Sequence, residues 1–213
     1  MTPRERLQDS RLYLVCDARP LEFLRAALRG GVDLVQLRDK TLDDDGLIVA
    51  ARPFREAADE LGALFLLNDR PDLVAACGAD GVHVGQDDAT PAAARAVVGP
   101  DRIVGRSTHA PAQADAAAAD PDVDYLAVGP VHVTPTKPGR PAAGLDYVAY
   151  AAASVPKPWF AIGGLDAGNV AEAVARGARR IVVVRALTVA RDPEAAAREL
   201  RQALEVPVGT PQP

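Results

Sequence analysis

Apolar runs and helical stretches alternate eight times along the chain, and this alternation predicts an α/β fold, a single (β/α)8 TIM barrel. Most of the runs are continuously apolar, which is typical of parallel strands that are buried on both faces. A length of 213 residues suits one domain of this class. A doubly wound open sheet is the alternative. The predicted strands are residues 11–16, 32–37, 64–68, 81–84, 102–106, 125–128, 159–162 and 180–184.

The helical stretches carry their own start and break signals. Leucines at positions 21, 24 and 28 form one apolar stripe, which the Gly30–Gly31 pair ends. Thr90 and Asp192 each precede a proline suited to the first turn of a helix, and both are good N-caps. Pro53 falls inside a helical stretch and is expected to kink or restart that helix.

The composition narrows the class of protein. The net charge is −5, aromatics are few and no basic block is present, which argues against nucleic acid or an anionic membrane as a partner. Cys16 and Cys77 lack a C-x-x-C spacing and are expected to be buried thiols in a reducing compartment. No signal-like segment or membrane-length apolar run is seen, so we expect a cytoplasmic protein. We expect a catalytic domain over 11–204, with 1–10 frayed and 205–213 a disordered tail.

Polar residues gather where the predicted strands end. Barrel enzymes build their active sites at the carboxyl ends of the strands. Scattered structural polar residues would not favour one end of so many strands, so a functional site is expected there. The residues concerned are Gln36, Arg38, Asn68, Asp69, Gln86, Asp87, Asp88, Ser107, His109, Thr134, Thr136, Lys137, Gly163, Gly164 and Arg185.

Two aspartates follow neighbouring predicted strands. Asp69 and Asp88 emerge at the same end of the sheet if these strands are parallel neighbours. Two facing carboxylates repel each other, and a cation between them removes that repulsion. Mg²⁺ suits one or two such ligands, because it retains waters and also takes substrate phosphate oxygens.

A cationic segment, QLRDK, follows the second predicted strand. The two-residue period of a strand places Gln36, Arg38 and Lys40 on one side. Arginine offers a bidentate fork to phosphate oxygens and lysine adds a compact charge. A solvated charge run that merely ends a strand is the alternative interpretation.

Two later segments also suit an anionic ligand. Residues 129–144 present Thr134, Thr136 and Lys137 within four positions, and 138–143 are a candidate lid. An ordinary surface loop is the alternative. The glycine pair after the seventh strand and the end of the eighth match the phosphate site common in barrels.

The histidines suggest no nucleophilic machinery. His83 lies within a predicted strand and is expected to be a hydrogen-bonded core residue. His109 is a candidate to line the site, and His132 is expected to pack against the following loop. Neither a Ser-His-Asp nor a Cys-His arrangement can be assembled.

In combination these segments resemble the thiamine-phosphate synthase (thiamine-phosphate pyrophosphorylase) family, from YLVCD through VVVRAL. The motifs are QLRDK, NDRPDL with GVHVGQDD, GPVHVTPTKPG, AIGGL and VVVRA, at residues 36–40, 68–73, 81–88, 129–139, 161–165 and 182–186. The chain departs from the family at Arg185, where serine is common, and at His132, where an apolar aromatic residue is frequent.

The resemblance implies a role for each motif residue. The pyrimidine diphosphate would be bound by Gln36, Leu37, Arg38, Asp39, Lys40, Asn68, Ser107 and Lys137, of which Arg38, Lys40, Ser107 and Lys137 would be catalytic. Asp69 and Asp88 would bind Mg²⁺, with Asp87 left out because the family's metal position aligns with the second aspartate of GQDD. The thiazole phosphate would be bound by Thr134, Pro135, Thr136, Gly164, Val184 and Arg185.

The activity implied is that of a transferase of a non-methyl alkyl or aryl group. It would join 4-amino-2-methyl-5-(diphosphooxymethyl)pyrimidine to 4-methyl-5-(2-phosphooxyethyl)thiazole, or to the carboxylated thiazole, and release pyrophosphate in thiamine biosynthesis. The resemblance also suggests a homodimer. Two alternatives remain: an isomerase like the related thiazole tautomerase, which needs neither diphosphate clamp nor metal pair, and a non-catalytic, ligand-binding regulatory barrel.

Overall fold

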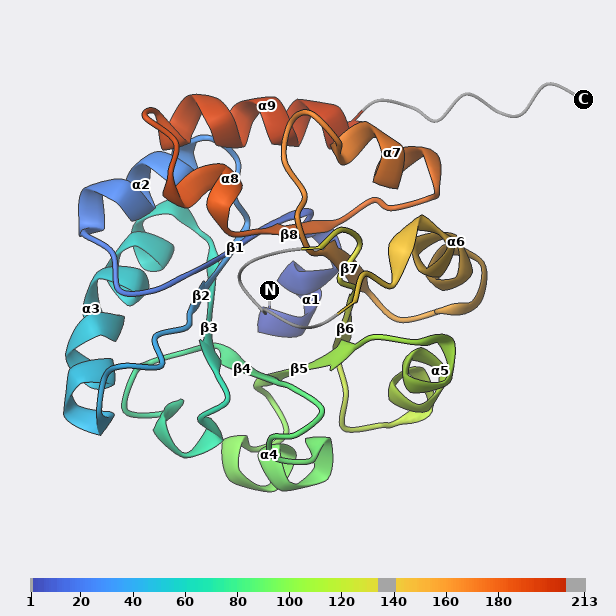
Figure 1. Cartoon of the computed structure of the whole chain (residues 1–213). Coiled ribbons are helices and arrows are strands. Elements are labelled where there is room, and N and C mark those ends of the chain that lie inside the picture. The colour runs from blue at the N-terminus through green and yellow to red at the C-terminus, as the bar shows by residue number, and fades with distance from the viewer. Residues whose placement is uncertain (1, 134–140, 206–213) are drawn as a thin grey trace, which may run out of the picture.

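Eight parallel strands close into a barrel in chain order, as seen in Figure 1. The structure is a computed structural model that describes residues 2–133 and 141–205. Each strand pairs with the next, and β1 pairs with β8. The predicted barrel is therefore confirmed and the open sheet is wrong. The strands are β1 (Leu12–Cys16), β2 (Leu34–Leu37), β3 (Leu64–Asn68), β4 (Gly81–Val84), β5 (Ile103–Thr108), β6 (Tyr125–Val128), β7 (Trp159–Ile162) and β8 (Ile181–Val183).

Helices surround this barrel, and α1 lies at the centre of the ring in the view of Figure 1. Among the described residues, no helix is long and apolar enough to cross a membrane. The helices are α1 (Pro3–Asp9), α2 (Leu21–Arg29), α3 (Asp44–Leu61), the 3-10 helix η1 (Pro71–Leu73), α4 (Pro91–Val98), α5 (Pro111–Ala119), α6 (Gly144–Ser154), α7 (Val170–Ala175), α8 (Arg185–Thr188) and α9 (Pro193–Glu205).

The pleat of the strands divides the apolar side chains into two cores. Leu34 of β2 points inward and joins a cluster inside the barrel with Tyr13, Tyr125 and Phe160. Val35, its neighbour, points outward and belongs to the larger cluster between the strands and the helices. Burial on both faces explains why the runs are continuously apolar rather than alternating.

The N-terminal segment corrects one expectation. Residues 1–10 were expected to fray, but Pro3–Asp9 form α1 and Leu7 is buried in the inner core. A capping box starts the helix: Glu5 N donates to Thr2 Oγ1 at 3.3 Å, and Thr2 N donates to Glu5 Oε2 at 2.7 Å. The prediction was wrong because one buried leucine closes the base of the barrel, a contact that local sequence does not reveal.

Helix α3 corrects a second expectation. Pro53 does not restart the helix, which runs unbroken from Asp44 to Leu61. Proline removes the N–H that would bond to the carbonyl of Val49. Val49 is 57% exposed, so water can reach that turn. The buried Phe54 and Ala57 hold the helix on the barrel beyond the proline.

The other local predictions are confirmed. Thr90 Oγ1 accepts from Ala93 N at 3.2 Å, and Asp192 Oδ1 accepts from Ala195 N at 2.9 Å. The two free cysteines are buried. At the other terminus, Glu205 belongs to α9 rather than to the predicted tail, and residues 206–213 lie outside the described part of the chain.

Candidate active site

Buried polar side chains line the inside of the barrel near its carboxyl end. Gln36 of β2, His83 of β4 and Ser107 of β5 are 2%, 8% and 6% exposed. They share the inward parity of the inner core, so they face the barrel axis. Leu37 has the opposite parity and lies in the outer core. Gln36 and Leu37 were both predicted to bind the pyrimidine diphosphate. The side chain of Gln36 points into the barrel, whereas that of Leu37 points away from it.

Asp69 adopts a strained backbone at the end of β3. Its φ is 58°, a left-handed conformation found at no other non-glycine residue in the described part of the chain. Its backbone N donates to the carbonyl of His83 at 2.8 Å, and Asn68 Nδ2 donates to its Oδ2 at 2.6 Å. The strained turn is thus held by β4 and by the preceding residue, which fixes the direction of the carboxylate.

A loop anchored to β5 presents Asp88. Gly85 N donates to Asp88 Oδ2 at 2.9 Å, which orients the carboxylate. Arg106 Nη1 donates to the carbonyls of Gly85 and Ala89 at 2.6 and 3.2 Å, on either side of the aspartate. Sequence reasoning did not assign Arg106. Arg106 comes one position before Ser107 in β5, so its side chain points away from the barrel interior. This alternation along the strand is the sequence signal that distinguishes Arg106 from the residues inside the barrel.

The two aspartates converge, as the sequence predicted. Burial raises the pKa of Asp69, and the neighbouring Asp88 carboxylate, within hydrogen-bonding range, raises it further. Lys40 and the Asn68 amide act in the opposite direction. The pair is therefore an electrostatically unfavourable arrangement that a bound cation would relieve.

The donor set fits Mg²⁺ better than a cation that needs an all-protein cage. Residues 2–133 and 141–205 contain no group of three or more His, Cys, Asp or Glu side chains able to hold a metal. Two carboxylates are enough for Mg²⁺, which completes its shell with water and phosphate oxygens. Asp69 and Asp88 are the side chains that would hold it.

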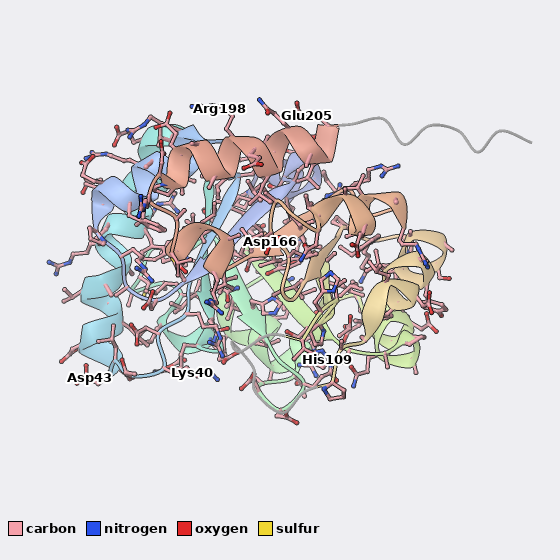
Figure 2. All side chains as sticks on the ribbon, turned by 45° about the horizontal axis from the view of Figure 1, so that its top comes forward. Lys40, Asp43, His109, Asp166, Arg198 and Glu205 are labelled. Carbon is pink, nitrogen blue, oxygen red and sulfur yellow. The ribbon has the colours of Figure 1, made fainter. Side chains whose placement is uncertain are left out.

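The segment after β2 brings a cation to this pair. Lys40 Nζ lies 3.4 Å from Asp69 Oδ2, and its side chain is 60% exposed. Arg38 is half-buried at the end of β2. Asp39 instead organises the turn: hydrogen bonds from the hydroxyl and backbone N of Thr41 lower the pKa of its carboxyl. In Figure 2, Lys40 and His109 lie along the same edge of the molecule.

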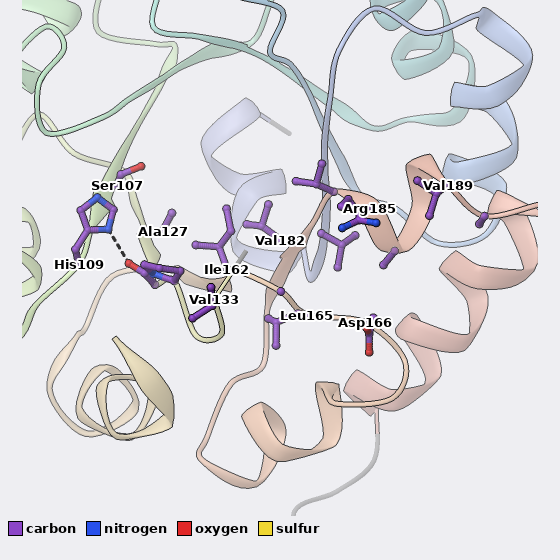
Figure 3. A pocket seen from close by; sticks show the side chains of 18 residues that line it. Ser107, His109, Ala127, Val133, Ile162, Leu165, Asp166, Val182, Arg185 and Val189 are labelled. Carbon is purple, nitrogen blue, oxygen red and sulfur yellow. Dashed lines mark hydrogen bonds between the residues drawn. The ribbon is translucent and has the colours of Figure 1, made fainter. Parts of the chain in front are cut away.

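A pocket of about 460 Å³ opens beside these groups, at the carboxyl ends of β5 to β8. Figure 3 shows Ser107 and His109 on one side of it and Asp166, Arg185 and Val189 on the other. The predicted residues Ser107, Gly164, Val184 and Arg185 meet here, whereas Asn68, Asp69, Asp88 and Lys40 lie outside its lining. The lining comprises Ser107, His109, Ala127, Gly129, Pro130, Val133, Ile162, Gly163, Gly164, Leu165, Asp166, Val182, Val183, Val184, Arg185, Ala186, Val189 and Ala190.

Backbone groups form one wall of the pocket. Gly163 and Gly164 have φ values of 113° and 66°, and a Cβ on Gly163 would lie 2.6 Å from Pro130 Cα. This close approach lets His132 N donate to the carbonyl of Gly163 at 3.0 Å. Arg185 begins the four-residue helix α8, in which Leu187 N and Thr188 N donate to the carbonyl of Val184 at 3.2 and 3.0 Å, so the N–H groups of Arg185 and Ala186 precede the helical hydrogen bonds. Such groups favour an anion.

Several expectations concern residues near this wall. His109 lines the pocket, as expected, and its Nδ1 lies 2.6 Å from the carbonyl of Gly129. His83 is a hydrogen-bonded core residue, as expected. Sequence reasoning missed Asp166, Val189 and Ala190, which lie outside the quoted motifs, and it gave no role to the apolar lining residues Ile162, Leu165, Val182 and Val183 within AIGGL and VVVRA. The predicted Thr134, Pro135, Thr136 and Lys137, and half of the candidate lid (138–140), lie outside the described residues.

A β/α barrel with a carboxylate pair, adjacent cations and a glycine-walled pocket at the carboxyl ends of its strands has the architecture of a TIM-barrel enzyme. Within that class the family is established by sequence. A model of the family TMP-TENI, thiamine monophosphate synthase, matches residues 12–187. The chain belongs to this family of transferases.

Individual relatives agree over nearly the whole chain. The thiamine-phosphate synthase of Thermobifida fusca is 54% identical over 209 residues, covering 95% of this chain and 96% of that protein. The thiamine-phosphate synthase of Thermus thermophilus is 53% identical over 202 residues, covering 91% and 97%. Among solved structures, a thiamine phosphate pyrophosphorylase from Pyrococcus furiosus superposes with a TM-score of 0.84 at 31% identity, covering 95% and 97%.

Proposed function

We propose that this chain condenses the diphosphate of an aminopyrimidine methanol with a thiazole phosphate, or its carboxylated form, and releases pyrophosphate to give thiamine phosphate. The observation that carries the proposal is the division of the barrel mouth. The carboxylate pair and Lys40 lie at the ends of β2 to β4, and the glycine-walled pocket lies at the ends of β5 to β8. Two small phosphorylated substrates would thereby meet with Ser107 between them.

The diphosphate belongs on the first side. Arg38 and Lys40 follow β2, and Asn68 lies at the end of β3. Cations here neutralise the negative charge that grows as the carbon–oxygen bond to the diphosphate breaks. Mg²⁺ bound by Asp69 and Asp88 would add electrostatic stabilisation of the departing pyrophosphate.

The substitution itself needs no protein nucleophile. The bond from the pyrimidine methylene to the diphosphate oxygen breaks, and the thiazole nitrogen donates its electron pair to the same carbon. An aminopyrimidine delocalises positive charge, so bond breaking can run ahead of bond making. The chain's task is to hold the two rings in line and to stabilise the leaving group, with Arg38, Lys40 and Lys137 as the cations and Ser107 on the pyrimidine.

The thiazole phosphate belongs in the pocket. Gly164 and the start of α8 at Val184 and Arg185 lie together on its wall. The apolar lining from Ile162 and Val182 suits a methylthiazole ring beside its phosphate. Thr134 and Thr136 would complete the phosphate cup.

The carboxylate pair separates this function from the two alternatives. An isomerase acting on the thiazole phosphate alone would need the pocket but not the pair. A regulatory binding barrel would not need the cations beside a leaving group. Burial and the facing Asp88 carboxylate raise the pKa of Asp69 and so disfavour its charge, and Mg²⁺ held by a synthase would relieve this unfavourable charge.

Pyrophosphate release measured with both substrates and Mg²⁺ tests the proposal. A synthase releases pyrophosphate only when both substrates are present, and a chelator stops the release. Conversion of the thiazole phosphate alone, without pyrophosphate, would indicate the isomerase. Binding without any conversion would indicate the regulatory barrel.

A further inference from the structure

A line of buried hydrogen bonds crosses the barrel beneath the mouth. Gln36 Nε2 donates to the hydroxyl of Tyr13, which lies 3.0 Å from the hydroxyl of Tyr125. The Tyr125 hydroxyl is 2.8 Å from His83 Nδ1, and His83 Nε2 is 2.8 Å from Ser107 Oγ. Side chains from five strands thus connect Gln36 to Ser107. We call these five residues the relay.

The barrel interior is shaped to hold the relay. A Cβ on Gly105 would lie 2.2 Å from the ring of Tyr125, so only glycine admits the ring at that point of β5. Phe160 packs edge-on against Tyr13 and Tyr125, with ring centroids 5.5 and 5.6 Å away. Such contacts fix both ring planes and therefore both hydroxyl positions.

Counting protons gives the relay a direction. The Tyr13 hydroxyl accepts from the Gln36 amide, so its own proton is satisfied within the relay only by donation to Tyr125. Tyr125 then donates to His83 Nδ1, which must be the unprotonated ring nitrogen. His83 Nε2 carries the proton and donates to Ser107 Oγ.

This direction leaves the hydroxyl proton of Ser107 available. Ser107 Oγ already accepts from His83, and Ser107 lines the pocket. A hydroxyl with an occupied acceptor site is preorganised to donate. The ring nitrogens of an aminopyrimidine are acceptors that match it.

We propose that Tyr13, Tyr125 and His83 are positioning residues that hold Ser107 as a hydrogen-bond donor to a pyrimidine ring nitrogen. The direction of the relay starts from the Gln36 amide nitrogen, which donates to the Tyr13 hydroxyl. The identity of the ligand rests on the proposed function, whereas the direction of the relay does not.

The tautomer of His83 tests the direction of the relay in the absence of substrate. His109 Nδ1 lies 2.6 Å from the carbonyl of Gly129, which can only accept, so His109 carries a proton on Nδ1. Nitrogen-15 NMR of the full chain, with His109→Gln for assignment, is expected to show His83 protonated on Nε2 alone. A proton on Nδ1 of His83 would overturn the relay's direction.

The affinity for the pyrimidine diphosphate tests the positioning role of the relay. Tyr125→Phe removes one hydroxyl, and Tyr150→Phe removes another that donates to Asp115 on the surface and serves as the matched control. By calorimetry with Mg²⁺, Tyr125→Phe is expected to weaken pyrimidine diphosphate binding roughly tenfold. Thiazole phosphate binding and the Tyr150→Phe variant should be unchanged.

The outcomes separate the two proposals. Equal pyrimidine affinity in wild type and Tyr125→Phe overturns the positioning role. An equal loss of affinity for both substrates, with a lower Tm, indicates a merely structural hydroxyl and also overturns it. If wild type binds no pyrimidine diphosphate, the proposed function fails, and the tautomer of His83 still decides the relay's direction.

Discussion

Lys40 Nζ lies 3.4 Å from Oδ2 of Asp69, which joins the cationic segment after β2 to the carboxylate pair. The Asp88 carboxylate also lies within hydrogen-bonding range of Asp69, so the Asp69 carboxylate has an attractive and a repulsive neighbour at once. A diphosphate with Mg²⁺ would complete this arrangement, because it supplies negative oxygens for Lys40 and a cation for the aspartates.

Neutralising either aspartate should change the Mg²⁺ dependence of turnover. Asp69→Asn and Asp88→Asn each remove one charged ligand, so each should raise the Mg²⁺ concentration needed for half-maximal rate and slow turnover by about 10²–10³. Steady-state rates across a Mg²⁺ titration check this. The control is Asp87→Asn, at the exposed residue next to Asp88. If all three variants and the wild type showed the same Mg²⁺ dependence, Asp69 and Asp88 would not be the metal ligands.

The same Asp69→Asn change should stabilise the metal-free protein. The raised pKa of Asp69 means that the fold disfavours its charged form. Asparagine removes that charge and tolerates the left-handed backbone at φ 58°. Thermal unfolding in chelator should give the variant the higher Tm. A lower Tm would mean that the carboxylate stabilises the fold even without a cation.

Lys137→Ala should depress turnover strongly, by about 10²–10³, because it removes a cation proposed to act on the leaving group. The measurement is kcat at saturating concentrations of both substrates. Near-normal rates would remove Lys137 from the site.

Arg185→Ala should weaken the use of thiazole phosphate if the guanidinium reaches the phosphate. The loss of one charge-assisted hydrogen bond should raise the KM for thiazole phosphate about tenfold. Arg191→Ala, on an exposed residue of the following loop, is the matched control. An unchanged KM in Arg185→Ala would mean that α8 contacts the phosphate through its backbone and not through the Arg185 side chain.

Leu7→Ala should destabilise the barrel by about 2–5 kcal/mol, because Leu7 is buried in the inner core from the N-terminal side. Chemical denaturation measures the change. The control is Leu61→Ala at an exposed position of α3. Equal stabilities for the two variants would contradict the role of α1 as the base of the barrel.

Most of the fold could be predicted from local sequence patterns. The predicted runs 81–84, 125–128 and 159–162 coincide with β4, β6 and β7, because strands buried on both faces are apolar without interruption. Helix α1 was missed because Leu7 is its one buried residue, and the surface on which Leu7 packs exists only after the barrel closes.

The site was predictable where it depends on strand ends. Asp69 and Asp88 were placed together because the carboxyl ends of neighbouring parallel strands meet. The relay could not be predicted, because the Tyr13 and Tyr125 hydroxyls meet across 112 residues of sequence inside the closed barrel. Nothing local in either tyrosine's strand signals that contact.

The central claim is that Asp69 and Asp88 hold Mg²⁺ on the departing pyrophosphate. Calorimetric titration of the full chain with inorganic pyrophosphate, with and without Mg²⁺, tests it most directly. We expect binding that requires Mg²⁺, that is lost in Asp69→Asn and Asp88→Asn, and that is retained in Asp87→Asn. Pyrophosphate binding of equal affinity in the presence of chelator, or undiminished in both aspartate variants, would contradict the claim.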